Sequence, residues 1–245
     1  MKEGKGLLHD AVDAHGGLER WKEINEITFS AQTGGVALPL KLQFGAFRHY
    51  RGIVSADADH PYAAFTPHPQ DPLQGVFQNG AVRILAPGGR VVAEHKNPRS
   101  RFGDLTHMFM WDPLDSLYFG GYAMWNYMNL PFLLTAPGFE LFEMDPWDEG
   151  GHKLRRLHAI FPAKMHTHSR EQTFYFSEDG LLVRHDYTAE VFGSWAKAAH
   201  YCVGHKEFGG LTFPTMRRVF PRKQDNTPLR LITLVSIDIG DIKLV

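Results

Sequence analysis

The chain has 245 residues, of which 43% are hydrophobic, and its 26 basic and 27 acidic side chains give a formal net charge of -1. This length suffices for one large all-β or α+β domain, or for two small ones, with a core that needs no metal or disulfide. The near-zero charge creates no overall field that attracts nucleic acid, and the single cysteine, Cys202, excludes a disulfide within the chain.

The N-terminus and the cysteine content indicate the cellular compartment in which the protein works. Residues 1–10 lack the apolar core of a secretory signal, and no run approaches the ~18 apolar residues that a membrane-spanning helix needs. A lone cysteine fits a reducing environment, and its neighbours Tyr201 and Val203 favour a half-buried, unreactive thiol. We therefore expect a cytoplasmic protein without a transmembrane segment.

The first 44 residues change from a helical to a strand pattern. Apolar residues from Leu7 to Trp21 recur at helical spacing, but Gly16-Gly17 interrupts them, so we expect a short helix, a kink and a second turn that ends near Ile24. From Ile27 the apolar period is two, which predicts strand structure. The same alternation predicts a half-buried strand with one face formed by Leu38, Leu40, Leu42 and Phe44, and the other by Lys41 and Gln43.

Short strands separated by turn residues follow. The segments 74–78, 81–86 and 90–95 are joined by Asn79-Gly80 and by Pro87-Gly88-Gly89, which are typical of hairpin turns. The first half of the chain is therefore predicted to be an antiparallel meander.

The segment from Met108 to Gly138 is unusually rich in large apolar and aromatic residues. Asp112-Pro113 is typical of a helix start, because aspartate caps the N-terminus and proline suits the first helical position. Although Asp112 could also serve as a catalytic acid, the capping role is the simpler interpretation. We predict a helix from Pro113 to Asn129 that ends before Pro131 and packs its apolar face on the sheet.

Six more strands are predicted in the second half, and they span 154–161, 170–176, 181–192, 198–203, 213–220 and 231–239. No internal repeat, low-complexity linker or change in composition marks a second domain. We expect a single α+β domain over residues 1–245, with a strongly curved antiparallel half-barrel sheet of roughly nine to eleven strands. The N-terminal helix and the 113–129 helix would pack in its concave face.

The order of these elements resembles the LolA/LolB-like lipoprotein-carrier fold family. The phrases that carry the resemblance are Gln172-Thr-Phe-Tyr-Phe176, Glu178-Asp-Gly-Leu-Leu182 and Arg184-His-Asp-Tyr187, which look like the strand, turn and strand of such proteins. Residues 14–21, 122–127 and 213–218 look like segments of uncharacterised bacterial proteins with this architecture. The resemblance implies a half-open barrel with a cavity for a hydrophobic ligand, and it includes no catalytic signature.

Two side chains of the predicted strand 181–192 are candidates for chemistry. His185 and Tyr187 share the apolar, buried face with Leu181, Val183, Ala189 and Val191, so they could exchange a proton or hold a polar ligand group. Asp186 points to the opposite face and cannot orient His185. The simpler interpretation is a histidine and a tyrosine whose polar atoms are satisfied by core neighbours.

Arg217 shares a strand face with Phe213, Thr215 and Val219, so it could reach inward to bind a carboxylate or phosphate, while Arg218 faces water. An equally simple interpretation places both arginines on a solvated edge strand.

The His166-x-His168 pair lacks a third ligand at a diagnostic spacing, so a solvated loop is favoured over a metal site. No nucleophile elbow and no glycine-rich phosphate loop is present, so we expect neither a serine or cysteine hydrolase nor a nucleotide cofactor.

These patterns favour a protein that binds a hydrophobic or amphipathic small molecule and needs no cofactor. The expected pocket lies between the curved sheet and the aromatic helix, and His185, Tyr187 and Arg217 would hold the polar end of the ligand. The alternative is a cofactor-independent cyclase, isomerase, lyase or hydratase that uses His185 and Tyr187 as an acid–base pair. The expected pocket lining is Trp111, Tyr122, Trp125, Tyr127 and Phe132.

Overall fold

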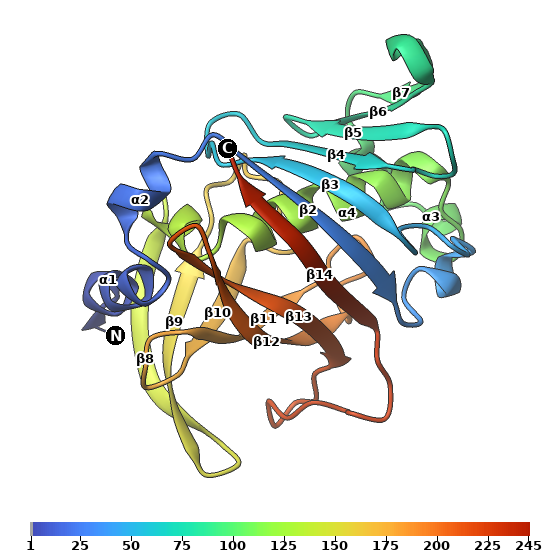
Figure 1. The fold of residues 1–245 in the computed structure, drawn as a ribbon. Helices are drawn as coiled ribbons and strands as arrows, with labels where there is room; N and C mark the ends of the chain where they lie inside the picture. The colour runs from blue at the N-terminus through green and yellow to red at the C-terminus, as the bar shows by residue number, and fades with distance from the viewer. Residues whose placement is uncertain (1) are drawn as a thin grey trace.

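The computed structural model describes residues 2–245, whose strands form one antiparallel sheet that bends into two halves (Figure 1). In this part of the chain the sheet has 14 strands, in the order β1-β8-β9-β10-β11-β12-β13-β14-β2-β3-β4-β5-β6-β7. The order runs from one edge to the other, so the sheet is open. The strands are β1 (Lys2–Glu3), β2 (Glu26–Gly34), β3 (Tyr50–Ser55), β4 (Tyr62–Thr66), β5 (Gln74–Gln78), β6 (Ala81–Leu85), β7 (Val91–His95), β8 (Glu140–Glu149), β9 (His152–Ile160), β10 (Glu171–Phe176), β11 (Leu182–Thr188), β12 (Lys197–Phe208), β13 (Leu211–Pro221) and β14 (Val235–Leu244).

The helices are few. The predicted break at Gly16-Gly17 is confirmed, because both glycines have positive φ, at 109° and 85°, between the first two helices. The helices are α1 (Lys5–Ala14), α2 (Leu18–Lys22), α3 (Leu105–Phe109) and α4 (Pro113–Asn129), with 3₁₀ turns η1 (Pro39–Lys41), η2 (Pro87–Gly89), η3 (Pro98–Arg101) and η4 (Phe132–Thr135). Within residues 2–245, no helix combines the length and apolarity that crossing a bilayer requires.

The predicted hairpins of the first half are confirmed. β5 and β6 are joined by Asn79 and Gly80, with φ of 50° and 87°, as a two-residue hairpin turn requires. The sheet has more strands than expected because β1, β3, β4 and β8 were not identified individually from the sequence.

The prediction of a strand at residues 38–44 is wrong. This segment is part of the connection between β2 and β3 and contains only the η1 turn. Leu40, Leu42 and Phe44 are 68%, 54% and 73% exposed, whereas Lys41 is 4% exposed. Leu38 is 7% exposed, as predicted, but from Leu40 to Phe44 the burial is the reverse of the predicted alternation. Lys41 is buried because its ammonium group donates hydrogen bonds to the carbonyl oxygens of His107 and Met108.

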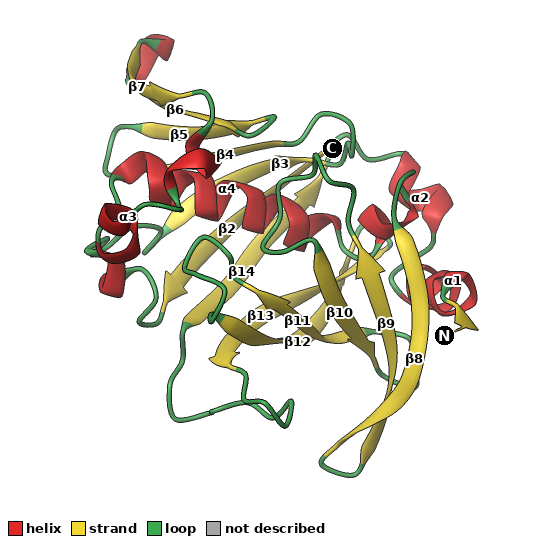
Figure 2. Cartoon of the chain, turned by 180° about the vertical axis from the view of Figure 1, so that it is seen from behind, coloured by secondary structure: helices red, strands yellow, loops and turns green. Residues whose placement is uncertain are grey.

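Helix α4 crosses the sheet and packs against β3 to β7 (Figure 2). Two glycines allow this close approach. A Cβ atom on Gly121 would lie 2.4 Å from the Cβ atom of Phe77 on β5, and one on Gly120 would lie 2.4 Å from the ring of Phe47. The helix is buried along most of its length and forms the centre of the main hydrophobic core.

The opposite face of β10 to β12 is also buried, which corrects the expectation that only one face of strand 181–192 would be. Arg184 and Asp186 are 0% and 3% exposed. They form two hydrogen bonds of 2.8 Å, and Arg184 also donates to Glu149 and to the carbonyl oxygen of Asn226. This ion-pair network buries the two polar side chains without leaving them unpaired.

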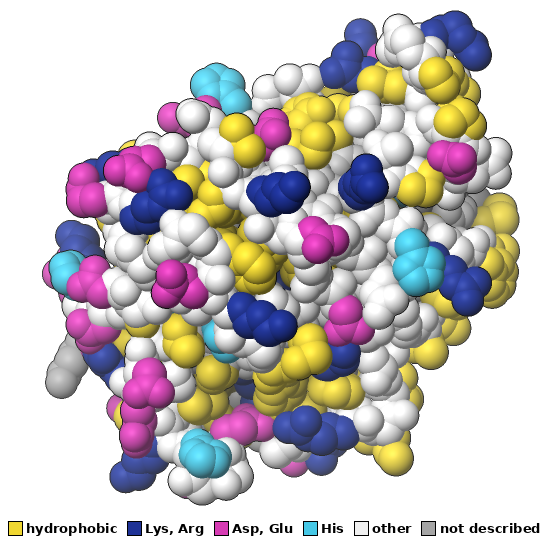
Figure 3. Space-filling view, viewed as in Figure 1, with side chains coloured by type: hydrophobic (Ala, Val, Ile, Leu, Met, Phe, Trp, Pro, Cys, Tyr) yellow, Lys and Arg dark blue, Asp and Glu magenta, His cyan; other side chains and the backbone are white. Residues whose placement is uncertain are grey.

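The outer face of β14, β2 and β3 carries dispersed charged side chains (Figure 3). Apolar side chains gather instead at the right-hand edge of that view, where Figure 1 draws α3 and the β2–β3 connection. The exposed apolar residues of these two segments are Val36, Leu40, Leu42, Phe44, Leu105, Met108, Phe109 and Met110.

Candidate functional site

Helix α4 begins as the sequence predicts. The carboxylate of Asp112 accepts hydrogen bonds from the N–H groups of Leu114 and Asp115, at 2.8 and 3.0 Å, and the carboxylate of Asp115 accepts one from the N–H of Asp112. This reciprocal capping box confirms the N-cap role of Asp112.

The expected pocket residues are all buried, but they do not surround one space. Trp111 packs against Phe102, Phe119 and Phe192 near the start of α4. Trp125 donates from Nε1 to the Ser55 hydroxyl on β3 at 3.2 Å.

Phe132 lies beyond the other end of α4, where its ring stacks on that of Trp21 at 4.4 Å. Trp111, Trp125 and Phe132 therefore lie at three separate places along the helix, and each fills the core locally.

Tyr122 and Tyr127 meet at one histidine. The Tyr127 hydroxyl lies 2.6 Å from Nε2 of His168, and the Tyr122 hydroxyl lies 3.2 Å from Nδ1. Burial lowers the pKa of His168 to about 3, so the ring is neutral at pH 7 and has one donor and one acceptor nitrogen. The His168 ring stacks on Tyr187 at 3.9 Å, and the hydroxyl groups of Tyr127 and Tyr187 are 3.0 Å apart.

The prediction of a solvated loop at His166-x-His168 is wrong. Thr167, His168 and Ser169 are buried. His166 lies with its Nδ1 atom 2.8 Å from the Tyr118 hydroxyl. In residues 2–245 no three His, Cys, Asp or Glu side chains converge as a metal site requires.

His185 reaches the interior from β11, on the predicted face. Its Nε2–H donates a hydrogen bond to Oε1 of Gln172. The amide nitrogen of Gln172 donates to the Thr167 hydroxyl and to the Ser169 carbonyl oxygen, at 2.6 and 2.8 Å, so the orientation of the amide is defined. This fixes the proton on Nε2 and leaves Nδ1 as a buried acceptor with no hydrogen-bond partner in the described structure. Burial also holds the pKa of His185 well below its usual range.

His185 and Tyr187 lie side by side but do not share a proton directly. Their ring centroids are 4.9 Å apart, while the Tyr187 hydroxyl points to Tyr127 and, at 3.5 Å, to Nδ1 of His200. Burial raises the pKa of Tyr187 and lowers that of His200 well below its usual range. Both side chains are therefore neutral at pH 7.

His168, Gln172 and His200 were not identified as site residues from the sequence. His200 is the cross-strand partner of His185, and Gln172 comes from β10 on the other side of β11. The strand register brings Gln172 and His200 to His185 and Tyr187, and that register is not visible in the apolar pattern of one strand. His168 comes from the connection between β9 and β10, whose path the sequence does not reveal either.

Arg217 points inward, and its neighbour Arg218 is partly exposed and paired with Asp238, as one of the two sequence interpretations expected. Arg217 donates from Nη2 to the carbonyl oxygen of Tyr127 at 2.8 Å and from Nη1 to Sγ of Cys202 at 3.3 Å. Its guanidinium lies 4.8 Å from the centre of the Tyr127 ring. β13 is an inner strand, which excludes the interpretation of a solvated edge strand.

Cys202 is 0% exposed, where the sequence suggested a half-buried thiol. Burial raises its pKa, so the thiol remains protonated and unreactive at pH 7.

A small cavity of about 30 Å³ lies between α4 and the strands β2, β3 and β14. This volume is enough for about one water molecule, whereas small-molecule sites occupy roughly 300–1,000 Å³. Of the residues expected to line the pocket, only Tyr127 borders this cavity, and the other four pack into the core. The cavity is lined by Thr33, Leu38, Phe47, Tyr50, Phe119, Gly120, Ala123, Met124, Tyr127, Val235 and Ile237.

An open hollow of about 180 Å³ adjoins this cavity at the β2–β3 connection. Thr33 and Leu38 line both spaces, so they separate the interior from the surface. Leu38 belongs to the β2–β3 connection, which is held to α3 by the hydrogen bonds from Lys41 to the carbonyl oxygens of His107 and Met108.

Comparison with known proteins gives matches only at the level of structure. No protein-family model matches the sequence, and no curated protein matches it either. A LolA superfamily protein from Nitrosomonas europaea superimposes with a TM-score of 0.55 at 9% identity, covering 100% of this chain and 94% of that one.

A domain from Vibrio parahaemolyticus that is described as an outer membrane lipoprotein-sorting protein gives a TM-score of 0.54 at 9% identity, with 98% of this chain and 91% of that chain covered. At such identities the matches concern the fold alone. They confirm the resemblance inferred from the sequence, and the chain has the fold of the LolA/LolB-like lipoprotein-carrier family.

Proposed function

We propose that the protein binds a hydrophobic or amphipathic small molecule between α4 and the sheet, on the concave side. The observation that carries this proposal is the cavity between α4 and β2, β3 and β14, whose lining is apolar apart from Thr33 and the hydroxyl groups of Tyr50 and Tyr127. The LolA-like fold supports it, because a sheet bent around an apolar helix forms a continuous apolar interface with that helix.

Binding requires the cavity to expand from about 30 Å³. The β2–β3 connection is the part of the wall that is suited to move. Leu42 and Phe47 in this connection have positive φ, at 61° and 58°, which is an unfavourable backbone conformation for side chains of this size. Displacing Leu38 would join the cavity to the outer hollow, so we propose that a ligand enters there.

The polar end of the ligand would lie toward Tyr127, which lines the cavity. Tyr127 contacts His168 and Tyr187 through its hydroxyl group and Arg217 through its ring and carbonyl oxygen. A ligand with a polar end would therefore find a group of hydrogen-bonding partners here, in addition to Thr33 and the Tyr50 hydroxyl elsewhere in the lining.

Native mass spectrometry tests the proposal. The protein is purified from its own host, its intact mass is measured, and any adduct is extracted under denaturing conditions and identified. A stoichiometric amphiphile is expected. A mass that remains adduct-free after incubation with host lipid extract would contradict the proposal.

A blocking variant locates the site. Ala123→Leu adds three carbon atoms at the wall of the cavity and should abolish adduct formation, because the added side chain occupies the remaining space. Lys206→Leu, on the exposed surface of β12, is the matched control and should retain the adduct.

The alternative proposal is a cofactor-independent enzyme. It is favoured by the chain of hydrogen-bonding groups that links His200, Tyr187, Tyr127 and His168, because such a chain can pass protons. The depressed pKa of His185 disfavours it as a general base, since an effective base has a pKa near the working pH. The enzyme would be favoured over the binder if the wild type converts a bound adduct and the His185→Gln variant converts it ~10²-fold or more slowly.

A further inference from the structure

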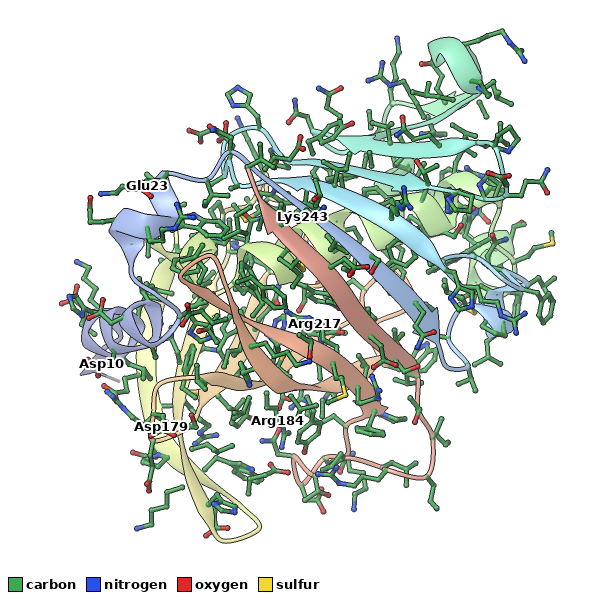
Figure 4. All side chains as sticks on the ribbon, viewed as in Figure 1. Asp10, Glu23, Asp179, Arg184, Arg217 and Lys243 are labelled. Atoms are coloured by element: carbon green, nitrogen blue, oxygen red, sulfur yellow. The ribbon has the colours of Figure 1, made fainter. Side chains whose placement is uncertain are left out.

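Within residues 2–245 two arginines are buried, and only one of them has an acidic partner. Arg184 and Arg217 are 0% and 1% exposed. Figure 4 labels both side chains. Arg184 forms ion pairs with Asp186 and Glu149, at 2.8 and 2.5 Å. Arg217 has no carboxylate within 4.0 Å in the part of the chain that the structure describes. Two carboxylates therefore neutralise the buried guanidinium of Arg184, whereas the buried guanidinium of Arg217 has no such partner.

The neutral contacts of Arg217 do not replace an anion. Its two Nη atoms donate to the Tyr127 carbonyl oxygen and to Sγ of Cys202, and its Nε atom has no hydrogen-bond partner in the described structure. A guanidinium remains charged at any physiological pH, and a buried charge without a counter-ion strongly destabilises a folded protein. An anion at Arg217 would remove this cost.

The groups around Arg217 can accommodate one negative charge. Cys202 is its cross-strand partner, and His200 lies two residues further on the same face of β12. Nε2 of His200 is buried without a hydrogen-bond partner and can donate when it carries the ring proton. Because His200, Cys202 and Tyr127 are all neutral, Arg217 is the single positive charge, and a monoanion balances it.

The position of Arg217 connects this charge to the proposed binding space. Tyr127 and Ile237 line the small cavity. The Tyr127 ring stacks on the guanidinium of Arg217, and Ile237 on β14 is the cross-strand partner of Arg217. An apolar chain in an expanded cavity would therefore end beside Arg217.

We propose that the ligand is an amphiphile with one terminal carboxylate, and that this carboxylate pairs with Arg217 and accepts a hydrogen bond from His200. A carboxylate fits because Tyr127, His200 and Cys202 enclose the site at 3%, 0% and 0% exposure, so the charged group must be the end of the molecule. A phosphodiester lipid carries substituents on both sides of its charge and would need space beyond Arg217. This inference depends on the proposed function, since it names the class of molecule that the cavity takes.

Three probes with the same alkyl chain test the head group: laurate, dodecanol and dodecyl phosphate, titrated into the wild-type protein at pH 7.5 below their aggregation concentrations. Laurate should bind at least about tenfold more tightly than dodecanol, the ratio expected when a charge-assisted hydrogen bond is gained. Equal affinities for laurate and dodecanol would overturn the carboxylate proposal while leaving the apolar site intact. Tighter binding of dodecyl phosphate than of laurate would also overturn it. Binding of none of the three would overturn the proposed function itself.

Variants assign the preference to Arg217. Arg217→Met should bind laurate and dodecanol equally, and Arg217→Lys, which retains the charge, should keep part of the preference for laurate. Arg218→Met, on the opposite face of the same strand, is the matched control and should behave like the wild type. An unchanged preference in a folded Arg217→Met protein would overturn the assignment. If Arg217→Met does not fold, the Arg217→Lys variant and the wild-type head-group comparison still decide the question.

Discussion

Individual residues of the interior are unusually polar, and the sequence could predict some of them but not their partners. The period of two along β11 and β13 correctly placed His185, Tyr187 and Arg217 on the inner face, because alternate strand residues point to the same side. Their contacts with His168 and His200 depend on pairing between distant segments, which one sequence does not reveal.

The Arg184–Asp186 pair gives a prediction about stability. Arg184→Met should lower the free energy of unfolding by about 3–5 kcal/mol, because Asp186 would remain buried without its partner. Urea denaturation followed by circular dichroism measures this loss. Arg218→Met removes a partly exposed pair with Asp238 and should cost about 1 kcal/mol or less. Similar losses in the two variants would contradict the account of the buried pair.

Among the elements, those with strong local signals were predicted well. Asp112-Pro113 and Pro131 gave the bounds of α4, and Asn79-Gly80 gave the β5–β6 hairpin. The prediction at residues 38–44 was wrong because a short alternating pattern does not by itself distinguish a strand from an irregular connection. In this connection the ammonium group of Lys41 contacts two carbonyl oxygens and the rings of Trp111 and Phe192 in the interior, while Leu40 and Leu42 remain exposed.

The crossing of α4 over β5 gives a second prediction. Gly121→Ala should destabilise the protein by about 1–3 kcal/mol, because the new Cβ would lie 2.4 Å from the Cβ of Phe77 and the helix must shift outward. Gly6→Ala should be neutral or stabilising, because Gly6 is an exposed residue of α1 and the added Cβ would meet no neighbouring atom within 4 Å. Thermal unfolding of the two variants compares them, and a stable Gly121→Ala protein would show that α4 does not pack so closely.

The β2–β3 connection gives a third prediction. Lys41→Ala removes the hydrogen bonds to the carbonyl oxygens of His107 and Met108, so amide hydrogen exchange should accelerate in residues 36–47 and 105–110. If this connection covers the entrance, the association rate of laurate should also rise. Lys96→Ala, at an exposed position, is the control. Unchanged amide hydrogen exchange in Lys41→Ala would show that the hydrogen bonds of Lys41 do not hold the connection in place.

At the scale of the whole molecule, the sequence predicted an open curved antiparallel sheet but not its order. β14, at the C-terminal end, lies between β13 and β2, and this pairing closes the two halves of the chain into one sheet. Such a contact joins residues about 200 positions apart in the chain, so no local pattern indicates it.

Buried histidines make the stability of the whole molecule depend on pH. Burial lowers the pKa of His15 and His68 to about 4 and that of His168 to about 3, while the unfolded chain protonates its histidines near pH 6.5. The stability is therefore complete above pH 6.5 and is lost as the pH falls through the folded pKa values. Each such histidine should contribute a slope of about 1.4 kcal/mol per pH unit between about pH 6 and pH 4.

Urea denaturation at a series of pH values measures this slope, and His15→Gln tests its origin. The variant should show a slope smaller by the share of one histidine, because the glutamine does not titrate. A slope identical to that of the wild type would mean that His15 is not neutral in the folded protein.

Photo-crosslinking can locate an apolar ligand between α4 and the sheet. A fatty acid with a diazirine group in its alkyl chain is bound to the wild-type protein and irradiated, and the labelled peptides are identified by mass spectrometry. We predict label on α4 and on β2 or β14, the elements that line the cavity, and loss of this label in Ala123→Leu. Label confined to the exposed apolar residues of α3 and the β2–β3 connection, or to the outer face of the sheet, would exclude a ligand between α4 and the sheet.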